Sequence, residues 1–172
     1  LSNVKKMKRK ICGKKGDGYV RTFGSRPVEW AASESGPQWE GEYGTKLTKE
    51  RGLSLPKTLK DIFVDLARKV NFREDKIRQI SVPGFVHAGA VLIKTRIDCP
   101  KGYVCRYVRE EPYEIYADVS QFNKTLDALM EILHTMEIIN SSSNDDNITR
   151  WKNRGNFQKI EIPDCHYTPK KK

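Results

Sequence analysis

The clearest hydrophobic pattern in the chain runs from residue 55 to residue 70. Its large apolar residues recur every three or four positions, and charged residues occupy the opposite side of the corresponding helix. Pro56 suits the first turn of such a helix. The segment is therefore predicted to be an amphipathic helix, with an apolar stripe made of Leu59, Ile62, Phe63, Leu66 and Val70.

A second helix is predicted from about residue 120 to residue 139. Its apolar residues are spaced by alternating steps of four and three: Phe122, Leu126, Leu129, Leu133 and Met136. Ser120 can cap this helix, and the polar stretch NSSSNDDN ends it as a surface loop. We expect the stripes of both helices to form the core together with one face of a sheet.

Short runs with strand composition are separated by turn residues. They lie at 19–23, 76–82, 90–98, 103–110, 113–117 and 157–162. The central runs are predicted to form an antiparallel meander, in which Pro83-Gly84 closes one strand and CPKG forms a turn. Residues 24–56 read as irregular structure.

The predicted hairpin of 90–98 and 103–110 assigns side chains to faces by parity. If residue 99 or residue 97 pairs with residue 105, all even-numbered residues share one face of the sheet. That face carries Lys94, Arg96 and Arg106, and it is expected to be open to solvent. The odd-numbered face, which includes Tyr103 and Tyr107, is expected to meet the helices.

These elements predict an α+β fold, with an antiparallel sheet of about four to six strands packed by two amphipathic helices. A length of 172 residues suits one core. We expect a basic flexible arm at 1–18, a single α+β domain at 19–167 and a basic tail at 168–172. The chain begins with Leu, and we expect it to be a mature product or an excised domain.

The distribution of charge changes the functional interpretation. The net charge is +10, yet residues 16–169 hold 22 basic and 22 acidic residues, so the whole excess lies in the two ends. Residues 1–15 contain seven basic residues and no acidic one: Lys5, Lys6, Lys8, Arg9, Lys10, Lys14 and Lys15. A lysine-rich arm is suited to a polyanion, because each neutralised phosphate releases condensed counterions.

The first hypothesis is therefore a non-enzymatic domain that binds nucleic acid or another polyanion, in the nucleus or cytoplasm. The arm would provide the main contacts, and Lys94, Arg96 and Arg106 would provide contacts from the sheet face. Phosphate contacts carry no sequence information, so the pattern does not separate DNA from RNA or specific from non-specific binding. Three alternatives stay open for the arm: a nuclear-localisation signal, a contact with an anionic membrane or glycosaminoglycan, and a solubilising tail. A protein partner and any oligomeric state are compatible with the sequence.

The cysteines and sequons support an alternative hypothesis, a secreted interaction domain. Disulfides could link Cys99 with Cys105, and Cys12 with Cys165. Glycosylation sequons begin at Asn123, Asn140 and Asn147. The acidic, aromatic segment 29–43 could cover one edge of the core, shield the arm or dock a basic partner.

Catalytic and metal-binding signatures are weak. The sequence has no Walker-type glycine loop, no GxSxG and no HExxH, so an enzyme is less favoured than a binding domain and no cofactor is indicated. A metal-dependent nuclease is the third hypothesis, based on carboxylates near a lysine: Glu74, Asp75 and Lys76, with Asp61 and Asp65, which have helical partners in Lys57 and Lys69. A zinc site would need Cys99, Cys105, Cys165 and His166 to converge, and Glu131 with His134 makes only one copy of an ExxH step. No apolar run approaches the roughly 20 residues that span a bilayer.

Overall fold

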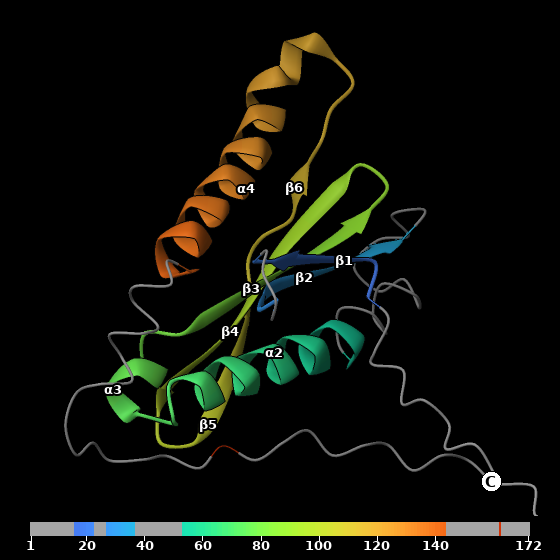
Figure 1. Cartoon of the computed structure of the whole chain (residues 1–172). Coiled ribbons are helices and arrows are strands. Elements are labelled where there is room, and N and C mark those ends of the chain that lie inside the picture. The colour runs from blue at the N-terminus through green and yellow to red at the C-terminus, as the bar shows by residue number, and fades with distance from the viewer. Residues whose placement is uncertain (1–15, 23–26, 37–52, 144–161, 163–172) are drawn as a thin grey trace, which may run out of the picture.

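The computed structural model describes residues 16–22, 27–36, 53–143 and 162. These residues form a mixed α+β fold in which a six-stranded sheet lies between helices (Figure 1). The strands are β1 (Gly18–Arg21), β2 (Glu29–Gly36), β3 (Ser81–Ala88), β4 (Val91–Lys101), β5 (Val104–Arg109) and β6 (Tyr113–Glu114). The helices are α2 (Leu55–Lys69), α3 (Glu74–Ile77), the short 3-10 turn η2 (Val119–Gln121) and α4 (Phe122–Ser143).

The sheet is mixed rather than purely antiparallel. Its strand order is β1-β2-β3-β4-β5, and β6 pairs with the first residues of β4 on the same edge that β5 occupies further along. Strands β2 and β3 are parallel, and every other pair is antiparallel. The predicted α+β class and strand number are confirmed, and the expectation of an antiparallel sheet is corrected by this one pair.

Helix α2 covers one face of the sheet, as its single apolar stripe predicts. Leu59 and Phe63 are fully buried, in a core that also contains Ile93 and Ile97 of β4. The helix approaches β3 at Gly84, where an added Cβ would lie only 2.7 Å from a methyl carbon of Leu59. The absence of a side chain at this position lets the helix reach the sheet.

Helix α4 packs against the other face, so the expectation that both helices share one face is wrong. Phe85 of β3 and Leu92 of β4 form a separate buried cluster with Ala128 of α4. The stripe that was predicted to enter the core is largely exposed, with Leu126 at 43% and Leu133 at 57% relative exposure. Helix α4 is apolar on more than one side, and the sheet contacts the side that was not predicted.

Two further elements differ from the sequence prediction. Strand β2 lies inside the segment that was predicted to be irregular. The predicted strand 76–82 instead contains the end of α3, a turn and only the first two residues of β3. Pro83 can sit inside β3 because β2 pairs with β3 only from Gly84 onward, so the missing N–H of the proline costs no ladder bond to β2.

One of the two hairpin registers that the sequence left open is confirmed. Ile97 pairs with Tyr107, and Asp98 pairs with Arg106, which is the register that places residue 99 opposite residue 105. The pairing shifts by one residue before Lys101 and Val104, where the chain turns through Gly102 with a positive φ of 59°.

Before η2, Asp118 accepts a hydrogen bond from the backbone N–H of Ser120, so the residue that caps this turn is Asp118 and not the predicted Ser120.

Candidate nucleic-acid interface

The predicted sheet-face cations lie together on the even-numbered face of β4 and β5. Lys94 and Arg96 alternate with buried residues along β4, and Arg106 lies opposite Asp98 on β5. Each of the three cations contacts a carboxylate on or beside this face. The carboxylates are Asp98, Glu110 and Glu131, so three negative charges accompany the three positive ones.

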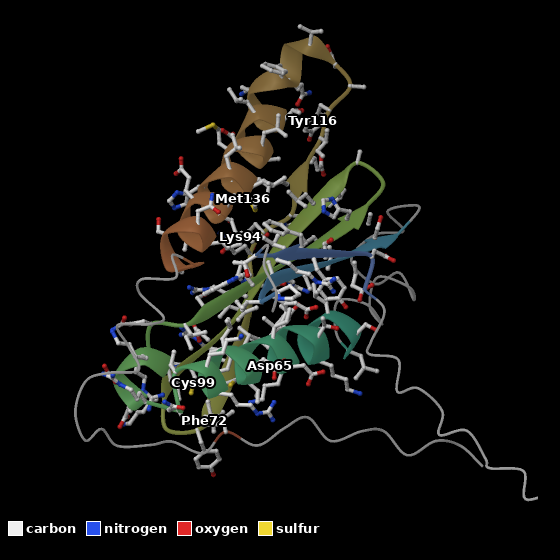
Figure 2. The ribbon with its side chains drawn as sticks, in the orientation of Figure 1. Asp65, Phe72, Lys94, Cys99, Tyr116 and Met136 are labelled. Atoms are coloured by element: carbon white, nitrogen blue, oxygen red, sulfur yellow. The ribbon has the colours of Figure 1, made fainter. Side chains whose placement is uncertain are left out.

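Lys94 is held beneath α4 rather than presented to solvent. Its side chain is only 14% exposed, and its ammonium group forms ion pairs with Glu131 of α4 and, at 3.4 Å, with Glu110. Burial alone would lower the pKa of Lys94, but the hydrogen bond to Glu131 and the charge of Glu110 raise it overall. Figure 2 shows Lys94 between the sheet and α4, where it stays charged and ties the helix to the strand.

Replacing Lys94 with methionine is expected to lower the free energy of unfolding by about 1–3 kcal/mol, because two glutamates would then face each other in a partly buried site. Urea unfolding at neutral pH measures this loss. The matched control is Arg68→Met, which removes an exposed pair with Asp65 and should cost about 0.5 kcal/mol or less. Adding Glu131→Gln to Lys94→Met should restore part of the lost stability, because one of the two facing charges is then removed. Equal losses of stability in the Lys94→Met and Arg68→Met variants would contradict the prediction.

Arg96 and Arg106 are more accessible and share one carboxylate. Arg106 donates two hydrogen bonds to Asp98, at 3.0 and 2.8 Å, and the Arg96 guanidinium lies 4.0 Å from the same side chain. The hydrogen bond to Asp98 raises the pKa of Arg106 above its already high value, so this guanidinium stays charged. Arg96 is 40% exposed and Arg106 is 54% exposed. Two cations against one anion leave this end of the sheet face locally positive.

A groove that the sequence did not predict lies between the start of α2 and the β4–β5 hairpin. Its volume is about 410 Å³, and it is lined by Pro56, Lys57, Lys60, Ile97, Tyr103, Val104, Cys105 and Tyr107. Tyr103 was expected on the core side, but it is 63% exposed because β4 continues through most of the predicted turn to Lys101 and β5 begins only at Val104, which leaves this ring at the hairpin end. Lysines beside tyrosine rings are typical of surfaces that bind single-stranded nucleic acid.

Two cysteines lie side by side at the end of this hairpin. Both are free thiols in the structure, and they follow directly on the Asp98–Arg106 pair. Burial raises the pKa of the Cys99 thiol, and the neighbouring Cys105 adds to this, whereas Arg78, whose Nη1 lies 3.2 Å from Cys99 Sγ, opposes it. Lys60 donates to Cys105 Sγ at 3.1 Å.

We expect oxidised glutathione to convert Cys99 and Cys105 into an intramolecular disulfide, because the two thiols are already neighbours. The two cysteines lose two hydrogens, one glutathione disulfide becomes two glutathione thiols, and the protein mass falls by about 2 Da. Intact-mass and peptide mapping measure the product, and Cys99→Ser is the control that should block it. A dominant bond to Cys12 or Cys165 would contradict the prediction.

The residues that were considered for catalysis or metal binding either form ion pairs with other side chains or do not converge on a common site. Glu74 pairs with Arg78, and Asp75 pairs with Arg73. Asp65 pairs with Arg68 rather than with the predicted Lys69. In the part of the chain that the structure describes, no three His, Cys, Asp or Glu side chains gather as a metal site.

The ExxH step also diverges, since Glu131 contacts Lys94 while His134 is 64% exposed and lies near Glu137. The other predicted zinc ligands, Cys165 and His166, lie outside the described residues.

Some of the remaining predicted sites lie in the described part of the chain, and others lie outside it. Asn123 and Asn140 are both exposed on α4, in positions that a glycan could reach. Asn147 lies outside the described residues, as do Cys12 and all seven basic residues of 1–15. Ile162, the last residue of the predicted strand 157–162, is buried in the core at 4% exposure, and the rest of that strand is outside the described residues.

Comparisons of the chain with protein-family models, with curated proteins and with solved structures found no significant match. Among the residues that the structure describes, no helix has both the length and the hydropathy that crossing a bilayer requires.

Proposed function

We propose that this chain is a non-enzymatic domain that binds nucleic acid or a similar polyanion, with most of the binding energy supplied by the basic residues of 1–15. The partition of charge carries this proposal. The described residues hold 14 basic and 15 acidic side chains, a net charge of −1, while the whole chain is at +10. The remaining residues therefore hold 18 basic and 7 acidic side chains, and a polyanion would be attracted to them rather than to the sheet and helices.

Two surfaces of the described residues favour a nucleic acid over other polyanions. Arg96 and Arg106 share Asp98 and provide local positive charge on the sheet face. The groove beside the hairpin adds Lys57 and Lys60 together with the exposed ring of Tyr103. Within the groove, phosphates could contact Lys57 and Lys60 while bases stack on the ring of Tyr103, an arrangement that tolerates any sequence.

Fluorescence anisotropy tests the proposal directly. The full chain is titrated at low salt into labelled 20-nucleotide single-stranded DNA, single-stranded RNA, duplex DNA and heparin. We expect binding to the nucleic acids with little dependence on sequence and with dissociation constants of roughly 10⁻⁶–10⁻⁴ M near physiological salt. The proposal fails if no nucleic acid binds at low salt, and binding of heparin alone would favour a sulfated sugar as the partner.

The alternative, a secreted and glycosylated interaction domain, is supported by the exposed positions of Asn123 and Asn140 and by the neighbouring thiols of Cys99 and Cys105. The intact mass of the protein from its native source, with and without reductant, separates the two proposals. Glycans and disulfides would place the protein outside the cell, and an unmodified, reduced chain would favour the nucleus or cytoplasm.

A further inference from the structure

Helix α4 has an apolar side that nothing in the described structure covers. The side that meets the sheet includes Ala128, Thr135 and Ile139, which are all at or below 5% exposure. About a quarter of a turn or more around the helix lies a second apolar set that is between 43% and 57% exposed: Phe122, Leu126, Leu129, Met130 and Leu133. Figure 1 shows α4 contacting the sheet along one side and extending beyond it.

The outward set has the spacing of a helix–helix seam. Phe122, Leu126, Leu129 and Leu133 follow steps of four, three and four, which keep apolar residues on one line along paired helices. Val119, in the turn η2 before α4, lies one step before this line at 87% exposure, whereas Met136, one step after it, is partly buried against the core. We call Phe122, Leu126, Leu129 and Leu133 the outward stripe.

The outward stripe is symmetric in spacing, since its steps are four, three and four in both chain directions. An antiparallel copy of the same stripe would therefore oppose apolar residues at every level. Leu126 would face Leu129 and Phe122 would face Leu133 of the other copy. Self-complementarity of one surface is what a two-fold dimer requires.

We propose that the outward stripe of α4 binds the outward stripe of a second copy of this chain, in an antiparallel two-fold pair. The proposal is independent of the proposed binding to nucleic acid. No charged residue interrupts the stripe, and the polar residues Asp127 and His134 lie on the remaining side of the helix.

The exposed area is sufficient for such a pair. A large apolar side chain exposes roughly 150–200 Å² when free, so the four stripe residues and Met130 beside them, each about half exposed, offer on the order of 400–500 Å² per copy. A standard interface buries about 800 Å² per partner, of which the apolar centre is a part and a polar rim supplies the rest. The stripe therefore has the size of the centre of a dimer interface.

Sedimentation velocity of the full chain between about 1 and 100 µM tests the proposal. The monomer mass is 19.8 kDa, and we expect it to double as the concentration rises. Leu129→Glu should raise the dissociation constant at least 10-fold, because each copy would place a charge against Leu126 of the other. Ile138→Glu is the matched control: Ile138 is 49% exposed on the same helix but lies opposite Leu129, and its substitution should leave the dimer intact.

The direction of pairing has its own test. Leu126→Glu and Leu129→Lys should each weaken self-association, and an equimolar mixture of the two variants should restore the doubled mass. In an antiparallel mixed pair, the glutamate at position 126 of one copy faces the lysine at position 129 of the other. The unchanged Leu129 of the first copy then faces the unchanged Leu126 of the second, and only an antiparallel pair gives both contacts.

Three results would overturn the proposal. They are a wild-type chain that stays monomeric to 100 µM, a dimer that is unaffected by Leu129→Glu, and equal disruption by Ile138→Glu. A monomeric wild type that loses stability in Leu129→Glu would show that another segment of the same chain covers the stripe, and this also refutes the dimer. Failure of the mixed variants to recover the doubled mass would refute the antiparallel arrangement.

Discussion

Substitution of Gly84 by alanine is expected to destabilise the fold by about 1–3 kcal/mol, and substitution by valine by more. A Cβ at this position would lie 2.7 Å from Cδ1 of Leu59 and 2.9 Å from Oγ1 of Thr95. Neither atom is free to move away. Leu59 and Thr95 are both fully buried, and the Thr95 hydroxyl donates a hydrogen bond of 3.1 Å to the carbonyl of Gly84. Helix α2 would have to shift away from the sheet that it covers.

The reduction in the free energy of unfolding can be measured by urea denaturation, with a double-variant cycle to identify its cause. Leu59→Ala alone should cost about 2–5 kcal/mol by leaving a cavity, but Gly84→Ala should partly fill that cavity. The decrease in the free energy of unfolding of the double variant is therefore expected to be smaller than the sum of the decreases in the two single variants. Simple additivity would show that contact between Gly84 and Leu59 is not what limits this position.

The difference between α2 and α4 shows how far a hydrophobic pattern can place a helix. Helix α2 has one apolar stripe and an opposite charged side, so only one orientation buries the stripe, and Leu59 and Phe63 are in the core as predicted. Helix α4 has apolar residues on two adjacent sides. Periodicity detects both sides equally and cannot tell which of them contacts the sheet, because that choice depends on the side chains of β3 and β4.

The strands show a similar limit. Alternation along β4 and β5 left two hairpin registers open but predicted the shared face of Lys94, Arg96 and Arg106, which is the same in both. Alternation could not reveal that α4 brings Glu131 to Lys94 on the same face, since Lys94 and Glu131 are far apart in the sequence. Strand β2 was missed because its sequence, EWAASESG, is rich in residues with low strand propensity and includes Glu34, which is nevertheless only 9% exposed.

The candidate interface was predictable in its charges but not in its shape. The excess of basic residues in 1–15 can be read directly from the sequence. The groove could not be predicted, because it depends on the packing of Lys57 and Lys60 of α2 beside Tyr103 at the hairpin end. Strand β5 begins one residue later than predicted, and this is enough to place Tyr103 in the turn and on the surface.

The largest expected functional effect comes from neutralising the charges of residues 1–15. A variant with glutamine at all seven basic positions keeps the length of the chain and removes seven positive charges: Lys5, Lys6, Lys8, Arg9, Lys10, Lys14 and Lys15. If all seven contact phosphates of a single strand, the logarithm of affinity should fall with the logarithm of salt at a slope of about −5. Raising the salt from 50 to 200 mM would then weaken the wild type about 10³-fold and the neutralised variant far less.

Two control variants separate the contributions of other surfaces. Arg96→Gln combined with Arg106→Gln removes the two accessible cations of the sheet face, and we expect it to change the slope by about 2 at most. Glutamine at Lys170, Lys171 and Lys172 tests the second basic segment of the chain. Circular dichroism of each variant confirms that a change in binding is not caused by unfolding.

The salt dependence of binding to a single-stranded oligonucleotide, compared between the wild type and the seven-fold glutamine variant, tests the central claim most directly. The account predicts that the steep slope and most of the low-salt affinity disappear together in the variant. A variant that keeps the wild-type slope and affinity would contradict it, and would mean that the electrically balanced part of the chain holds the binding surface.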